Sequence, residues 1–194
     1  MTLAMQNICM GCAKLITGTR TIAPLPDEIG ILGRGYLFDV IPVSVIIMIG
    51  LYILMTLFFS KTRAGRNLYA IGGGEEAAYF SGINTKKSYI MAFTLAGLFA
   101  GISACILISR LNSAGIGNGS GYEFEAMIGC VIGGVAFSGG KGKLMGVLLG
   151  VMFSVILFNG MTLLNVHSFV QDVFKGIVLI MAMGLDVLRN RKKG

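Results

Sequence analysis

Three long stretches of the chain contain no Asp, Glu, Lys or Arg: residues 40–60, 88–109 and 144–166. At 1.5 Å of rise per helical residue, each is long enough to cross the roughly 30 Å hydrocarbon core of a bilayer. Backbone groups in hydrocarbon must satisfy their hydrogen bonds within the protein, so apolar stretches of this length fold as helices. We therefore predict an all-α, polytopic integral membrane protein.

Two further segments raise the predicted number of crossings. Residues 169–188 are apolar but interrupted by Asp172, Lys175 and Asp186, and we count them as a span in which Asp172 and Lys175 form a local i,i+3 ion pair. Residues 1–13 match the latter part of another helix. Together with residues 126–140, these segments predict five to six transmembrane segments.

Residues 126–140 form a short, uncharged segment that is rich in glycine. Two interpretations stay open. A broken helix here would line the inner wall of a pathway, because irregular backbone is tolerated at membrane depth only beside protein or water. Alternatively, the glycines permit close helix contact in a short span. Three G-x-x-x-G pairs favour a packed bundle: Gly97 with Gly101, Gly129 with Gly133, and Gly146 with Gly150.

The composition excludes other classes of protein. Charged residues make up 13% of the chain, against about 25% in soluble domains. The net charge of +7 arises from 16 basic and only 9 acidic residues on an apolar chain. That balance indicates a membrane protein with a basic face rather than a nucleic-acid-binding protein.

Basic residues fix the expected orientation. Eleven of them fall in two connecting segments and the C-terminal tail, and by the positive-inside rule these regions are cytoplasmic. Alternation then requires residues 126–140 to cross the membrane or to function as a crossing. The eleven residues are Lys61, Arg63, Arg66, Lys86, Lys87, Lys141, Lys143, Arg189, Arg191, Lys192 and Lys193.

The basic loop, residues 61–87, contains helix formers between Gly74 and Gly82. This pattern predicts a short helix that Gly82 ends through a backbone conformation or a close approach that a Cβ would hinder. Glu76-Ala77-Ala78 gives the helix a low profile suited to a groove, with Tyr79 and Phe80 as anchors. The alternative interpretation is a solvated surface turn.

This loop, with its E-A-A-x-x-x-G arrangement and the following Ile83, resembles the coupling loop of permease subunits in ATP-binding cassette importers for simple sugars of the ribose, galactose and xylose type. A second likeness covers residues 121–128 and 133–142. Phe124, Glu125 and Ala136 depart mildly from the family pattern there. The resemblance extends over nearly the whole chain.

The resemblance implies that residues 1–194 form a single transmembrane permease domain, with residues 61–87 as its cytoplasmic coupling loop. Family members have roughly ten helices in two related halves, and this sequence matches only the second half of such an inverted-repeat permease. Three explanations stay open: a fragment, a truncated reading frame, or a half that pairs with a separately encoded one.

The resemblance also implies partners. A cytoplasmic ATP-binding cassette ATPase would contact the residues Glu76, Ala77, Ala78 and Gly82. An extracytoplasmic sugar-binding protein would deliver a monosaccharide such as ribose, and a second permease copy or paralogue would complete the pathway. We expect a multi-pass protein of the cytoplasmic (inner) membrane of a bacterium, in contact with lipid and not with nucleic acid.

Polar, uncharged side chains suit a sugar, which marks the Asn and Ser candidates for the pathway, and the two glycine candidates come from the short segment over residues 126–140. No P-loop is present, since Val135 stands where the Gly140-Lys141 pair would need its first glycine. We therefore expect no enzymatic activity, no catalytic residue, no cofactor and no metal site, with ATP hydrolysed by the partner. The pathway candidates are Asn112, Ser113, Asn118, Gly133, Gly134, Ser138 and Asn159.

A secondary transporter or channel-like protein is the alternative function. Such proteins usually need an ionisable residue deep in the bundle. The three long spans contain none, which disfavours this alternative.

Overall fold

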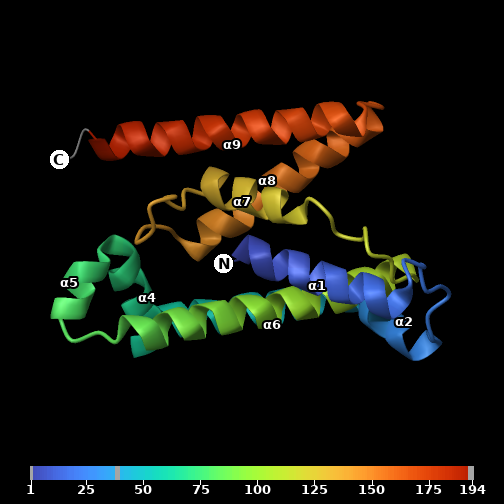
Figure 1. Ribbon diagram of the computed structural model, residues 1–194, viewed down its shortest axis with the longest axis horizontal. Coiled ribbons are helices and arrows are strands. Elements are labelled where there is room, and N and C mark those ends of the chain that lie inside the picture. Colours follow the sequence, from blue (N-terminus) through green and yellow to red (C-terminus); the bar gives the residue numbers. More distant parts are fainter. Residues whose placement is uncertain (1, 38–39, 192–194) are drawn as a thin grey trace. The chain divides into compact units, whose positions relative to one another are not determined.

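The computed structural model describes residues 2–37 and 40–191, most of them in helices (Figure 1). Lys192 and Lys193, two of the basic residues that predict the orientation, lie outside the described residues. The helices are α1 Thr2–Thr17, α2 Asp27–Arg34, α3 Val43–Lys61, α4 Arg63–Gly73, α5 Glu75–Phe80, α6 Thr85–Leu111, α7 Tyr122–Ile132, α8 Leu144–Leu163 and α9 Ser168–Arg191. Strands β1 Tyr36–Leu37 and β2 Ile41–Pro42 pair antiparallel.

The three charge-free stretches are confirmed as long apolar helices. Among the described residues, α3, α6 and α8 have the length and composition to cross a membrane. The predicted span over residues 169–188 is helical within α9, and residues 2–13 are helical within α1. That α1 and α9 cross the membrane stays a prediction, as do the total number of spans and the inverted repeat.

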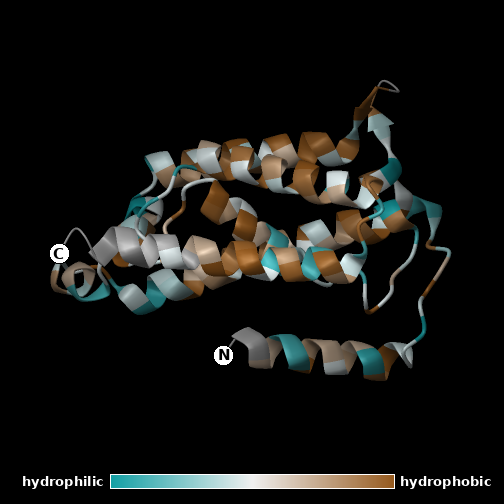
Figure 2. Ribbon diagram, turned by 90° about the horizontal axis from the view of Figure 1, so that it is seen from above, coloured by the Kyte–Doolittle hydropathy of each residue, from teal (hydrophilic) through white to brown (hydrophobic). Residues whose placement is uncertain are grey.

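Hydrophobic side chains lie mostly on the surface of these helices. Figure 2 shows hydrophobic residues along the long helices and hydrophilic ones in the connecting segments. Of the hydrophobic side chains described, only four are buried: Ile71, Ala78, Ile128 and Phe158. Apolar surface of this extent is unfavourable in water, so the helices suit a hydrocarbon environment.

The described contacts divide the chain into two compact units. Unit 1 comprises Met1–Met55 and Phe93–Ser120, and unit 2 comprises Thr56–Ala92 and Gly121–Gly194. This division neither confirms nor contradicts the prediction of a single domain over residues 1–194.

Unit 1 is organised around Ser109, near the end of α6. This side chain is 1% exposed. Its hydroxyl accepts a hydrogen bond from Gly33 N at 2.8 Å and donates one to Ile29 O at 2.5 Å, which fastens α2 to α6. In the middle of α6, a Cβ on Gly97 or Gly101 would meet no described atom within 4 Å. This G-x-x-x-G pair therefore has no partner helix among the described residues.

The core of unit 2 is an antiparallel contact between α7 and α8 made by four glycines. A Cβ built on Gly133 would lie 2.7 Å from the carbonyl carbon of Gly146, and one on Gly150 would lie 2.7 Å from Cα of Gly133. Gly150 also faces the carbonyl oxygen of Gly129. Two of the three predicted glycine pairs therefore pack on each other, backbone against backbone.

The short segment predicted over residues 126–140 is confirmed as short. Helix α7 has 11 residues, about 16 Å at 1.5 Å per residue, and non-helical chain follows it to α8. Close packing accounts for Gly129 and Gly133. That the segment also lines a pathway stays a prediction.

Three helices of unit 2 end in the same way. At the end of α5, Gly82 has a φ of +81°, and Ile83 N donates to Ala78 O at 3.1 Å. This is a Schellman motif, in which a left-handed residue lets the chain turn while it satisfies the last carbonyls. The same pattern ends α7 at Gly134 (φ +83°) and α8 at Asn165 (φ +58°).

The glycine contact predicts a difference between two glycines of α8. Gly150→Ala places a methyl group against the backbone of α7 and should cost about 1–3 kcal/mol, as overpacking does. Gly160→Ala, which meets nothing within 4 Å, should be neutral or gain up to about 1 kcal/mol of helix propensity. Thermal unfolding of the purified chain in detergent measures both, and equal midpoints for the two variants would contradict the packing.

Candidate functional site

Helices α4 and α5 occupy the basic loop, residues 61–87. Thr62 caps α4, since its hydroxyl accepts a hydrogen bond from Gly65 N at 3.0 Å. Gly74, in an extended conformation with φ 169°, separates the two helices. The predicted short helix is thus confirmed as α5, whereas α4 was not predicted.

Helix α5 exposes two aromatic side chains. Tyr79 is 65% exposed and Phe80 is 85% exposed, and their rings stand edge to face with centroids 5.9 Å apart. Together with Glu75, Glu76 and Thr85, they line an open groove of about 330 Å³. A short helix with protruding aromatics beside a groove is suited to docking a protein partner.

The four residues predicted to contact an ATPase differ in their positions on α5. Glu76 and Ala77 are exposed, and Gly82 ends the helix with a positive φ. Ala78 is buried, at 4% exposure, so its side chain faces into unit 2. The predicted conformation of Gly82 is confirmed, and the open space around it shows that no close approach is involved.

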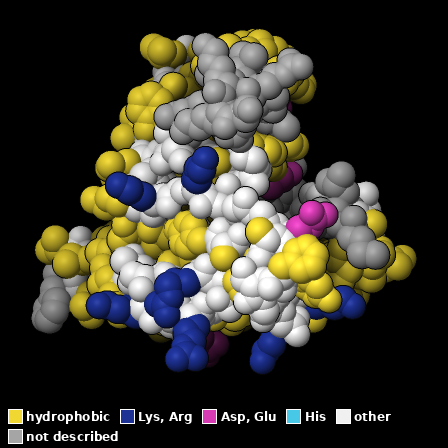
Figure 3. Space-filling model, turned by 90° about the vertical axis from the view of Figure 1, so that its left-hand side faces the viewer, with side chains coloured by type: hydrophobic (Ala, Val, Ile, Leu, Met, Phe, Trp, Pro, Cys, Tyr) yellow, Lys and Arg dark blue, Asp and Glu magenta, His cyan; other side chains and the backbone are white. Residues whose placement is uncertain are grey.

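Two basic segments that are distant in the sequence meet in unit 2. Tyr69 Oη of α4 donates a hydrogen bond to Gly142 O, in the connection between α7 and α8, at 3.2 Å. Figure 3 shows Lys and Arg side chains gathered on the side where α4 and α5 lie. The contact places both segments on the same side of the unit, as the orientation argument requires. The exposed basic residues of the two segments are Lys61, Arg63, Arg66, Lys86, Lys87, Lys141 and Lys143.

Three candidate pathway residues lie in unit 1, where they organise the chain after α6. Asn112 Oδ1 accepts hydrogen bonds from Leu25 N at 3.3 Å and from Arg34 Nη2 at 3.1 Å. Asn118 Nδ2 donates to Ser113 O at 3.0 Å. The amides of Asn112 and Asn118 therefore hold the loop in place.

The other four candidates lie in unit 2, in two places. Gly133 and Gly134 end α7, and Ser138 is an exposed residue of the connection that follows. Asn159 is also exposed, and it lies about 20 Å along α8 from Gly146, which Gly133 contacts. Within unit 2 the structure brings the first three together and leaves Asn159 apart.

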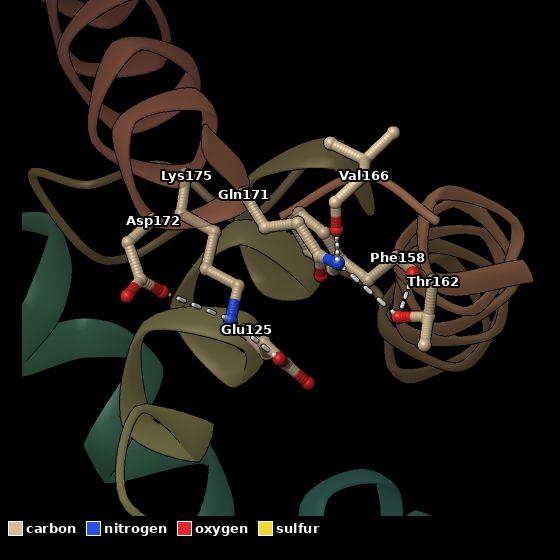
Figure 4. A network of polar contacts seen from close by, with 7 residues as sticks. All are labelled: Glu125, Phe158, Thr162, Val166, Gln171, Asp172 and Lys175. Atoms are coloured by element: carbon tan, nitrogen blue, oxygen red, sulfur yellow. Dashed lines mark hydrogen bonds and ion pairs between the residues drawn. The ribbon is translucent and has the colours of Figure 1, made fainter. Parts of the chain in front are cut away.

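An ion pair between α7 and α9 was missed by the sequence analysis. Lys175 Nζ lies 2.8 Å from Glu125 Oε1 of α7 and 3.7 Å from Asp172, the local partner that had been predicted. The ammonium group also lies 5.1 Å from the ring centroid of Phe158. Figure 4 shows Lys175 directed from α9 toward Glu125. The expected local pair is present, but the shorter contact joins two helices.

Neighbouring polar groups extend this contact to α8. Gln171 Nε2, on α9, donates hydrogen bonds to Thr162 Oγ1 at 3.3 Å and to Val166 O at 2.9 Å (Figure 4). The side chains of Lys175 and Glu125 are 14% and 24% exposed. Lys175 and Gln171, on the same helix, thus link α9 to both α7 and α8.

The described residues contain no cluster of three or more His, Cys, Asp or Glu side chains that would hold a metal ion. Unit 2 instead has an exposed short helix, a glycine-packed helix pair and a shielded ion pair.

The fold is that of a helical protein in which, among the described residues, three helices are long and apolar enough to cross a membrane. Residues 1–183 match the model of the family described as "branched-chain amino acid transport system / permease component". The chain belongs to this family, which is one of transport permeases and not of catalytic enzymes.

The curated relatives include permeases of sugar importers. The chain is 41% identical to the ribose import permease protein RbsC of Bacillus subtilis over 95% of its length, and 34% identical to the L-arabinose transport system permease protein AraH of Escherichia coli over 99%. It is 37% identical over 98% of its length to the probable ABC transporter permease protein YphD of Escherichia coli. The chain spans 58%, 58% and 57% of these relatives' lengths, respectively. No solved structure matches the chain.

The interhelical ion pair predicts different effects for two acids in the first turn of α7. Glu125→Gln leaves Lys175 without its nearest carboxylate and should lower stability by about 1.5–3 kcal/mol, the usual worth of a charged hydrogen bond. Glu123→Gln, at an exposed position, should have little effect. The charge-swapped double variant Glu125→Lys with Lys175→Glu should recover part of the loss.

Thermal unfolding in detergent measures these variants. Equal unfolding temperatures for Glu123→Gln and Glu125→Gln would show that the pair contributes no stability.

Proposed function

We propose that this chain is a membrane-spanning permease subunit of an ATP-binding cassette importer that moves a monosaccharide such as ribose into a bacterial cell. The identity to ribose and arabinose permeases supports the sugar class. A cytoplasmic ATPase supplies the energy, and an extracytoplasmic binding protein delivers the sugar. A second copy or paralogue, together with the remaining length that the relatives have, completes the transporter.

The observation that carries this proposal is the geometry of α5. Its exposed aromatic pair lies beside an open groove, and the Schellman motif at Gly82 fixes where the helix ends. The basic segments on the same side of unit 2 support a cytoplasmic position for α5. The basic residues of the C-terminal tail in the sequence support the same position for the C-terminus. An ATPase would bind on this side, with Glu76 and Ala77 at the contact.

The pathway itself we place along the connection after α7 and the exposed face of α8. Gly134 has a positive φ and open space around it, and Ser138 and Asn159 are exposed and polar. Gly133 contributes by keeping α7 close to α8. In unit 1, Asn112, Ser113 and Asn118 would shape the external side of the pathway. Not all three would contact the sugar.

Substitutions of Gly82 test the ATPase contact. Gly82→Val imposes a β-branched side chain on a left-handed backbone, at a cost of about 1–2 kcal/mol, and should disrupt the end of α5. Gly82→Asn, which tolerates this conformation, should behave like the wild type. Copurification of the ATPase with the full chain in its assembled transporter, together with sugar uptake, measures both variants.

The proposal expects Gly82→Val to insert in the membrane normally but to retain less ATPase and transport less sugar. Full ATPase retention and uptake by Gly82→Val would contradict the role of α5. An absence of any ATPase with the wild-type chain would contradict the proposed function as a whole.

A further inference from the structure

The end of α4 lies directly on the backbone of the glycine turn, which we define as residues 139–142. A Cβ added to Gly72 would lie 3.0 Å from Cα of Gly140 and 3.3 Å from the carbonyl carbon of Gly139. In the opposite direction, a Cβ on Gly140 would lie 2.6 Å from Cα of Gly73. Only glycine permits two backbones to approach this closely.

The glycine turn has a defined conformation of its own. Gly139 and Gly140 have φ values of +88° and +71°, a region that other residues rarely adopt. Ala136 N donates a hydrogen bond to Lys141 O at 3.0 Å, which closes the turn at its base. The turn therefore presents a formed surface to α4 rather than a loose strand of chain.

Both partners in this contact are joined to functional elements. On one side, Gly74 N donates to Ala70 O and Ile71 O at 3.2 Å, so α4 ends immediately before α5 begins. On the other side, the turn connects α7 to α8, whose glycines pack backbone against backbone. Gly74 alone separates α4 from α5, and Lys143 alone separates the glycine turn from α8.

We propose that the contact of Gly72 with the glycine turn transmits the displacement of α5 to the α7–α8 pair. This inference rests on the proposed function, because the displacement comes from the bound ATPase. Gly72 is a positioning residue in this account, and it contacts neither nucleotide nor sugar. The hydrogen bond from Tyr69 Oη to Gly142 O keeps α4 aligned with the turn.

Two adjacent glycines of α4 provide a matched pair of variants. Gly72→Ala and Gly73→Ala add the same methyl group and the same helix propensity to one helix. The methyl group of Gly72→Ala meets the backbone of Gly140, whereas that of Gly73→Ala meets nothing within 4 Å. A difference between them therefore reports the contact with the turn.

The readout is the number of sugar molecules imported per ATP hydrolysed by the assembled transporter, with ATPase copurification measured in parallel. We expect Gly72→Ala to retain the ATPase and to hydrolyse ATP, but to lose at least about fivefold in sugar moved per ATP, the lower end of usual coupling between sites. Gly73→Ala should match the wild type. Equal ratios for the two variants would overturn the proposal.

A cross-link keeps the proposal testable if Gly72→Ala fails to accumulate. In a Cys-free chain, Leu68→Cys of α4 and Lys141→Cys of the glycine turn line one groove, and a short bifunctional reagent should join them. Transport that persists after cross-linking supports the proposal that α4 and the glycine turn move together, and transport that stops overturns it.

If the wild-type chain retains no ATPase, both this inference and the proposed function fail. If the ATPase is retained but the coupling ratios of the two glycine variants are equal, this inference alone is overturned.

Discussion

Backbone-to-backbone contact between glycines is the constraint on which unit 2 depends. Lipid is as apolar as the helix surfaces, so no hydrophobic effect drives helices together inside a membrane, and close approach must supply the attraction. Gly133 against Gly146 provides this contact at the centre of the unit, and Gly72 against Gly140 provides it at the edge. In each case a Cβ would force the backbones apart.

Polar contacts complete what the glycines begin. The glycine contacts join α7 to α8 but leave α9 to be held by other means, and the Lys175–Glu125 pair and the Gln171 hydrogen bonds do this. A charged residue in an apolar setting is costly unless it is paired. Two lysine contacts, to a carboxylate and to the Phe158 ring, offset that cost while they fix the position of α9.

The sequence was sufficient for features that depend on neighbouring residues. Charge-free length predicted α3, α6 and α8, and the glycines at positions 74 and 82 correctly bounded α5. Helix α4 was not predicted, although Thr62 was an available capping signal. Likewise, Pro26 followed by two acids was a signal for the start of α2.

The sequence was insufficient where a contact joins distant segments. The partner of Lys175 lies 50 residues away, so only its neighbour Asp172 was visible. Spacing identified the G-x-x-x-G pairs but not which would meet, and it gave no sign that Gly72 contacts Gly140. For the same reason, the roles of Asn112 and Asn118 in holding the loop emerged only from their hydrogen bonds.

The central claim is that α5 and the glycine turn move together when the transporter works. Spin labels on Ser81→Cys, at the end of α5, and Lys141→Cys, in the glycine turn, both exposed positions, would report the distance between them in the assembled transporter. The account predicts the same distance distribution without nucleotide and with ATP bound, while a label on the ATPase moves relative to the membrane. A distance between the two labels that changes with nucleotide would contradict the account.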